Sequence, residues 1–216
     1  MSHPLNRRSF LATTAGLSAV LFCGRARAAT SDIIRVEQDW RLVIGDPQPD
    51  VDAPQIITVF GPRNPLTGLH AVYEINHSTM PDYSEGGMQL QAWSGNSLVG
   101  YKSQFAPAEL SVPNETITYT TATEVQTDGR VRMEVINGVS DTWGTFDGDR
   151  ALRLRVPSSI EDLNDWDPTN SIKHSRIGYG ANRIVMFKRT EIRYFNRDGL
   201  LDHTTTEDTV IEAWGG

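Results

Sequence analysis

Long polar side chains recur at every second position in three short stretches of the sequence, and together they could bind a sugar. The candidate ligand-binding residues are His70, Glu74, Gln89, Gln91, Trp93, Arg132 and Glu134. Alternate residues of a β-strand point to the same face. Amides and carboxylates form hydrogen bonds with hydroxyl groups, and an indole ring stacks on the apolar face of a sugar ring. These residues therefore predict a polysaccharide-binding surface on a β-sheet.

The same pattern has a simpler explanation, which stays open at this point. Polar residues alternate outward on any antiparallel sheet that has one face in water. Cross-strand Arg–Glu pairs on such a face each contribute only a few tenths to about 1 kcal/mol. Trp93 favours the binding hypothesis, because a large aromatic ring on a polar face needs a partner or a cover.

Signatures of catalysis are weaker than the binding pattern. Retaining glycosidases need two carboxylates about 5–5.5 Å apart, and a Glu-x-Asp-x-(x)-Glu strand is absent. A polysaccharide lyase would need a His or Tyr base near an Arg or Gln. The candidates for it are His70, Tyr73, Gln89 and Arg132, although Tyr73 should point away from His70. The sequence also lacks nucleophile-elbow, HExxH, P-loop and GxGxxG motifs, so a lyase or glycosidase is the alternative hypothesis only.

One loop gathers hard oxygen ligands that could bind a cation. The candidate metal ligands are Asp162, Asn164, Asp165 and Asp167. Ca²⁺ takes 6–8 oxygen ligands, but this stretch lacks the order of an EF-hand. The alternative is an Asx-rich loop after a short helix. We expect no cofactor apart from a structural Ca²⁺ at this loop, and we expect His174 and His203 to be surface histidines.

The elements that would position these residues are short strands joined by turns. Met88, Leu90 and Ala92 alternate with the polar residues of the same stretch, which indicates one face on a core and one in water. Asp128-Gly129 separates two β-type runs and predicts a hairpin. Capping-box spacing from Ser158 to Glu161 predicts one short helix, which Pro168 would limit. The sequence therefore predicts an all-β chain, a single antiparallel β-sandwich with one short helix.

The first 28 residues predict export. Arg7-Arg8, followed by Ser9-Phe10-Leu11, precedes an uncharged run that is too short to span a bilayer. Ala26-Arg27-Ala28 suits cleavage after Ala28. The arginine pair resembles a twin-arginine (Tat) signal, and an ordinary secretory signal is the alternative. We therefore expect a signal peptide at 1–28, one domain at 29–216, and a periplasmic or extracellular location.

Removal of this segment would change both the redox chemistry and the charge of the chain. Cys23 is the only cysteine, so the mature chain would have no disulfide, no zinc–thiolate site and no thiol nucleophile. The segment carries four arginines and no acidic residue, so the formal net charge would change from −7 to −11. A charge of that sign disfavours nucleic acid and anionic lipid as partners. No later apolar run reaches the length of a membrane span.

Two resemblances can be stated. Gly178 to Ile184, Ile192 to Phe195 and Asp198-Gly199 resemble the closing strands of concanavalin-like jelly rolls, which include lectin, laminin-G and polysaccharide-enzyme domains. With Glu37 to Trp40 and Asn137 to Gly144, the chain also resembles exported bacterial proteins, a resemblance that implies no chemistry. The first implies a jelly-roll sandwich and a polysaccharide ligand. We thus expect a non-catalytic exported binding protein; a carbohydrate-active enzyme and a structural envelope protein without a ligand are the alternatives.

Overall fold

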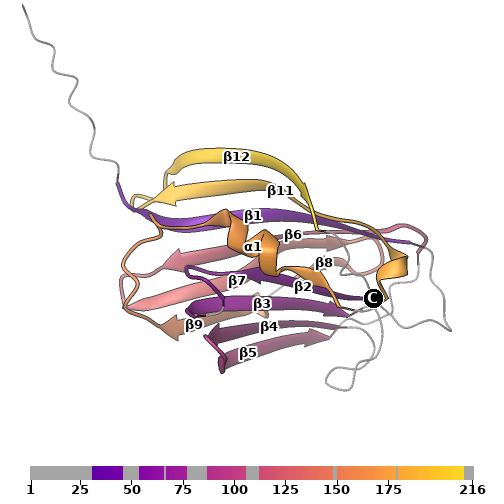
Figure 1. Ribbon diagram of the computed structural model, residues 1–216, viewed down its shortest axis with the longest axis horizontal. Helices are drawn as coiled ribbons and strands as arrows, with labels where there is room; N and C mark the ends of the chain where they lie inside the picture. Colours follow the sequence, from indigo (N-terminus) through magenta and orange to yellow (C-terminus); the bar gives the residue numbers. More distant parts are fainter. Residues whose placement is uncertain are drawn as a thin grey trace, which may run out of the picture. The chain divides into compact units, whose positions relative to one another are not determined.

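The computed structural model describes residues 31–45, 54–65, 67–76, 87–105, 112–147, 150–178 and 180–211. The predicted signal peptide lies outside these residues. The described part is mostly β-structure, arranged in two antiparallel sheets with one short α-helix (Figure 1). The prediction of an all-β sandwich is therefore confirmed.

The larger sheet has seven strands, in the order β12-β11-β1-β6-β7-β8, with β9 also paired to β7. Its strands are β1 (Ile33–Ile44), β6 (Glu115–Val125), β7 (Arg130–Ser140), β8 (Gly144–Phe146), β9 (Arg153–Pro157), β11 (Ile184–Asn196) and β12 (Leu201–Val210). The hairpin predicted at Asp128-Gly129 joins β6 to β7, and Gly129 adopts the positive φ of 75° that this turn requires.

The smaller sheet has five strands, in the order β10-β2-β3-β4-β5. Its strands are β2 (Gln55–Phe60), β3 (Leu69–Asn76), β4 (Gly87–Ser94), β5 (Ser97–Phe105) and β10 (Arg176–Ile177). Four of them follow one another along the chain as neighbours, whereas β10 reaches the edge of β2 from a distant part of the sequence. This long-range pairing brings residues near 175 to a sheet built from residues 55–105.

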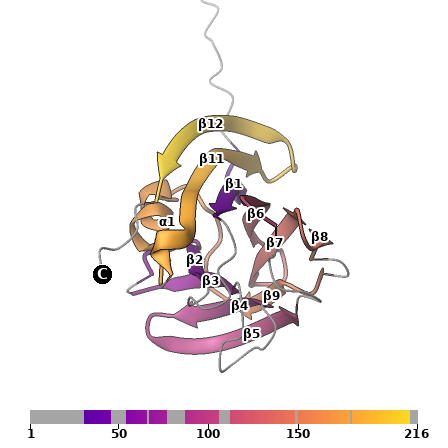
Figure 2. The same cartoon turned by 90° about the vertical axis from the view of Figure 1, so that its right-hand side faces the viewer.

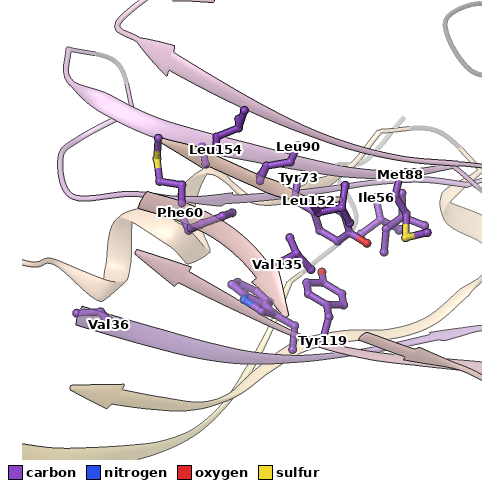
Figure 3. Close-up of a cluster of buried hydrophobic side chains, with 14 of the residues drawn as sticks. Val36, Ile56, Phe60, Tyr73, Met88, Leu90, Tyr119, Val135, Leu152 and Leu154 are labelled. Atoms are coloured by element: carbon purple, nitrogen blue, oxygen red, sulfur yellow. The ribbon is translucent and has the colours of Figure 1, made fainter. Parts of the chain in front are cut away.

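The hydrophobic core lies between the two sheets (Figure 3). Met88, Leu90 and Ala92 are buried in it, as their alternation predicts. The two sheets meet at Tyr73 of β3 and Tyr119 of β6, whose rings pack edge to face with centroids 5.0 Å apart. The opposite face of each strand is therefore free to carry the polar residues.

The short helix is not where the sequence predicted it. Residues 158–167 form no helix, because Ser158 Oγ accepts from Ile160 N at 3.2 Å and Leu163 N donates to Ile33 O at 2.7 Å. Instead α1 spans Pro168–His174, with Asp167 as its N-cap. Pro168 begins this helix rather than ending one, since proline's fixed φ and missing N–H suit the first turn.

The helix α1 lies at the side of the sandwich, between β11 and β2 (Figure 2). Arg189 of β11 donates to Pro168 O at 2.7 Å, and Val59 N of β2 donates to Ser175 Oγ at 2.9 Å. The first contact joins the start of α1 to β11, and the second joins the residue between α1 and β10 to β2. Within the described ranges, the chain forms no helix long and apolar enough to cross a bilayer.

Candidate functional site

The outer face of the five-stranded sheet brings together five of the predicted ligand-binding residues. In the β3–β4 register, His70 is paired with Trp93 and Glu74 with Gln89, while Gln91 is paired with Val72. Directly paired residues of antiparallel strands share a face. The intervening residues Ala71, Tyr73 and Ile75 are buried in the core, so His70, Glu74, Gln89, Gln91 and Trp93 all point away from it.

A hollow of about 370 Å³ opens on this face. Ile57, Val59 and Val72 contribute apolar surface to it, and four of the predicted residues line it: His70, Glu74, Gln91 and Trp93. The remaining lining residues are Pro65, Gly95, Asn96, His174 and Arg176. An apolar surface flanked by a few convergent polar groups is the usual make-up of a small-molecule site.

The polar side chains of β4 are joined by directional hydrogen bonds. Trp93 Nε1 donates to Gln91 Oε1 at 2.9 Å, Gln91 Nε2 donates to Gln89 Oε1, and Gln89 Nε2 donates to Ser103 Oγ at 3.1 Å. This chain of bonds orients both amides and the indole ring. Each amide has further donor and acceptor capacity, because an NH₂ group carries two hydrogens and a carbonyl oxygen two lone pairs.

His70 is held in one tautomer at the end of this face. Its side chain is buried, and its Nδ1 lies 3.0 Å from Gly68 O. A carbonyl oxygen only accepts hydrogen bonds, so Nδ1 carries the proton and Nε2 of the neutral ring has a free lone pair. Burial lowers the pKa of His70, and the bond to Gly68 O only partly offsets it. At neutral pH the ring is therefore uncharged.

Two further lining residues, His174 and Arg176, were missed by the sequence reasoning. His174 is the last residue of α1, and it is partly buried rather than the surface histidine that we expected. Within the described part of the chain, its Nε2 is buried and has no hydrogen-bond partner. Burial lowers the pKa of His174, with smaller contributions from Lys173 and His70. Arg176 is paired with Ile57 at the start of β10. No local spacing signals this arrangement, because it depends on the pairing of β10 with β2.

Arg132 and Glu134, the other two predicted ligand-binding residues, lie on the seven-stranded sheet and outside the hollow. Glu134 is buried and accepts from Arg35 at 3.0 Å and Arg153 at 2.5 Å, with Arg132 Nε 3.3 Å away. Burial acts to raise the pKa of Glu134, but Arg132, Arg35 and Arg153 outweigh it and lower the pKa. Here the simpler explanation, a face of cross-strand ion pairs, fits the structure.

A second hollow of about 430 Å³, lined in part by Asp39, Asn137 and Arg193, lies along β1, β6, β7 and β11. Two of its charged groups bind each other, since Arg193 contacts Asp39 at 2.5 Å. Arg193 also contacts two carboxylates next to the hollow, Glu37 at 3.1 Å and Glu191 at 2.6 Å. None of the seven predicted ligand-binding residues is among the described residues that line this second hollow, whereas four of them line the hollow on the five-stranded sheet, which is therefore the better candidate site.

In the predicted calcium loop, the polar side chains mostly serve the local backbone. Asp162 Oδ1 accepts from Asn164 N at 3.0 Å, and Asn164 Oδ1 accepts from Ile33 N at 2.9 Å. Asp167 accepts from Thr169 N at 2.9 Å as the helix cap, while Asp165 is exposed. Among the residues that the structure describes, no three His, Cys, Asp or Glu side chains are placed to hold a metal ion. The geometry favours the Asx-rich loop over a Ca²⁺ site.

Comparison with known proteins adds no assignment. No protein-family model matches the sequence, and no curated protein matches it. The geometry of the site therefore has to carry the functional argument.

That geometry supports binding better than catalysis. The residues of the lyase hypothesis are dispersed, since Tyr73 is buried in the core and Arg132 lies on the other sheet. Glu74 is the one carboxylate among the described residues that line the hollow, so a carboxylate pair for glycoside hydrolysis is not assembled there. What the hollow does offer is an aromatic ring, the oriented amide of Gln91 and neutral imidazoles around an apolar surface.

Proposed function

We propose that this chain is an exported protein that binds a polysaccharide on the outer face of the β10-β2-β3-β4-β5 sheet. The observation that carries the proposal is the placement of Trp93 in the hollow beside Gln91, Glu74 and His70. An indole ring binds the apolar face of a sugar, while amides, carboxylates and imidazoles bind its hydroxyl groups. Residues 6–28 support export, through the twin-arginine pattern and the cleavage pattern that follows it.

The strand beside Trp93 supports a ligand longer than one sugar. Leu98 of β5 is paired with Trp93, and Tyr101 of β5 is paired with Gln91. Both side chains are exposed, Tyr101 by 62%. A second aromatic ring on the same face would extend the stacking surface beyond the hollow, as a polymeric ligand requires.

The test is native affinity electrophoresis of the mature chain, residues 29–216, in gels that contain immobilised polysaccharides. The panel includes neutral glucan, mannan and xylan, together with alginate and polygalacturonate. Trp93→Ala should abolish retention, because it removes the stacking ring and the donor that orients Gln91. Trp93→Phe keeps a ring and should retain part of the binding, and Tyr101→Ala should weaken retention without abolishing it.

Leu201→Ala is the matched control, since Leu201 is an exposed apolar residue of β12 on the other sheet. It should be retained like the wild type, and thermal unfolding should show that every variant is folded. Retention of folded Trp93→Ala equal to that of the wild type would remove this face as the binding site. A wild-type chain that no polysaccharide retains would refute the proposed function.

A further inference from the structure

The polar groups of the hollow differ in whether they can donate or accept hydrogen bonds, and this difference restricts the ligand. Glu74 has only acceptor oxygens when it is ionised. Trp93 Nε1, a donor, is already bonded to Gln91. His70 lines the hollow with Nδ1 at Gly68 O, so its Nε2 is an acceptor. We propose that the hollow selects an uncharged sugar, one of whose hydroxyl groups donates a hydrogen bond to Nε2 of His70; this inference rests on the proposed polysaccharide-binding function.

The burial of His70 supports the assignment of its tautomer. His70 is 7% exposed, and its Nδ1 lies 3.0 Å from Gly68 O. With the proton on Nε2 instead, the lone pair of Nδ1 would face the carbonyl oxygen without a hydrogen bond, which is costly in a buried place. Nε2 is therefore the acceptor nitrogen of the neutral ring.

Protonation of His70 would convert this acceptor into a donor and would add a positive charge to the hollow. The charged and titratable groups around it are Glu74 on β3, Lys173 and His174 on α1, Arg176 on β10, and Arg63 in the loop before β3. Glu74 and Arg176 have opposite charges, so the permanent charges that line the hollow balance. A second positive charge would therefore meet His174 and Arg176 without a new carboxylate to pair with it.

The balance of charge also argues for a neutral ligand. The mature chain would carry a formal net charge of −11 once the four arginines of the first 28 residues are removed, and a field of that sign repels a polyanion. Within the hollow only Arg176 is a permanent cation among the described lining residues, and Glu74 offsets it.

The experiment compares binding at pH 7.5 and pH 5.0, with the neutral and acidic polysaccharides of the same panel. The wild-type chain should bind a neutral glucan, mannan or xylan more weakly at pH 5.0 than at pH 7.5, because the protonated imidazole no longer accepts. Since burial lowers the pKa of His70, isothermal titration in two buffers of different ionisation enthalpy, repeated at several pH values below 6.5, should show that binding releases protons. Alginate and polygalacturonate should be retained weakly at either pH.

His70→Gln should weaken binding at pH 7.5 and flatten its pH dependence, since an amide does not titrate in this range. His203→Gln is the matched control, because His203 is an exposed histidine of β12 on the other sheet; it should keep the wild-type profile. His174→Gln separates the two imidazoles of the hollow and should leave most of the pH dependence in place.

Several outcomes would overturn the inference while leaving polysaccharide binding intact. They are preferential retention on alginate or polygalacturonate, tighter binding at pH 5.0, proton uptake on binding, and an unchanged pH dependence in His70→Gln. Absence of binding to every polysaccharide at both pH values would overturn the inference together with the proposed function.

Discussion

Asp147, at the end of β8, carries an ionisable group in an unfavourable place. Its backbone adopts a φ of 67°, in the left-handed region, and its Oδ1 accepts from Leu152 N at 2.9 Å. Burial raises the pKa of Asp147 to about 6, with a further contribution from the charge of Glu134. The folded chain therefore binds a proton at this carboxyl group in a pH range where the unfolded chain has lost it.

This placement predicts a pH-dependent gain of stability in Asp147→Asn. The contribution of Asp147 to the free energy of unfolding should fall as the pH rises from about 4 to about 6, because this carboxyl group is less protonated in the unfolded state than in the folded state in that window. Asparagine keeps the acceptor oxygen, tolerates positive φ and does not ionise. At pH 7.5 the variant should be more stable by about 1 kcal/mol, after allowance for a half-buried site. Near pH 4 the two should be equally stable.

Urea unfolding at pH 4.0 and pH 7.5 measures both differences. Asp128→Asn is the control, since Asp128 is 52% exposed in the β6–β7 turn and should not change the pH slope. A constant difference between Asp147→Asn and the wild type at the two pH values would contradict the prediction.

At the scale of strands and helices, the alternation of apolar and polar residues was sufficient to predict a strand where one face of that strand is buried and the other is polar. Met88, Leu90 and Ala92 opposite Gln89, Gln91 and Trp93 determined the orientation of β4 correctly. It was not sufficient for β5 and most of β12, which we did not predict. Both are edge strands with exposed residues on both faces, so their side chains carry no regular apolar period.

Local signals also failed where another part of the chain competes for the same backbone group. The capping box at Ser158 predicted a helix, but Leu163 N donates to β1 instead. The alternation of residues likewise placed Arg132 and Glu134 on the polar face of their strand. It could not predict to which of the two sheets that strand belongs. These two features depend on pairing between strands that are distant in the sequence, and the spacing of residues within one strand does not predict such pairing.

Glu134 joins three strands of the seven-stranded sheet through its arginine partners. Arg35 is on β1, Arg153 on β9 and Arg132 beside Glu134 on β7. Through Arg35 and Arg132 the network also reaches Glu124 on β6. The carboxylate of Glu134 is 2% exposed, so loss of its charge would leave three partly buried guanidinium groups without their common partner.

We expect Glu134→Gln to lower the free energy of unfolding by about 3 kcal/mol at pH 7, the lower end for breaking a buried ion pair. Glu124→Gln, at a more exposed carboxylate of the same network, should cost about 1 kcal/mol. Because the pKa of Glu134 is lowered in the folded state, its contribution is present at neutral pH and is lost as the pH falls below its ordinary value of 4.5. Unfolding in guanidinium chloride at pH 7 and pH 4 measures the two losses of stability and their pH dependence. A loss for Glu134→Gln no larger than that for Glu124→Gln would refute the prediction.

At the scale of the whole molecule, the candidate site is assembled from segments far apart in the chain. The spacing of the residues correctly predicted which side chains of β3 and which of β4 point away from the core, and the pairing of the two strands then brings them onto one face. It could not predict that α1 and β10 would bring His174 and Arg176 to the same hollow. The sequence therefore predicts which residues of each strand share a face, but it does not predict which distant segments complete the lining of the hollow.

The prediction that concerns the whole chain is its route of export. A twin-arginine pathway requires both arginines, so Arg7→Lys/Arg8→Lys should retain the precursor in the cytoplasm, although the charge is unchanged. An ordinary secretory signal needs only a basic residue before its apolar run and should tolerate the change. Cell fractionation and immunoblotting of both chains distinguish the routes, with Arg25→Lys as the control that keeps the pair. If the double variant is cleaved and found in the periplasm, twin-arginine export is contradicted. If the wild-type chain is not cleaved, export itself is contradicted.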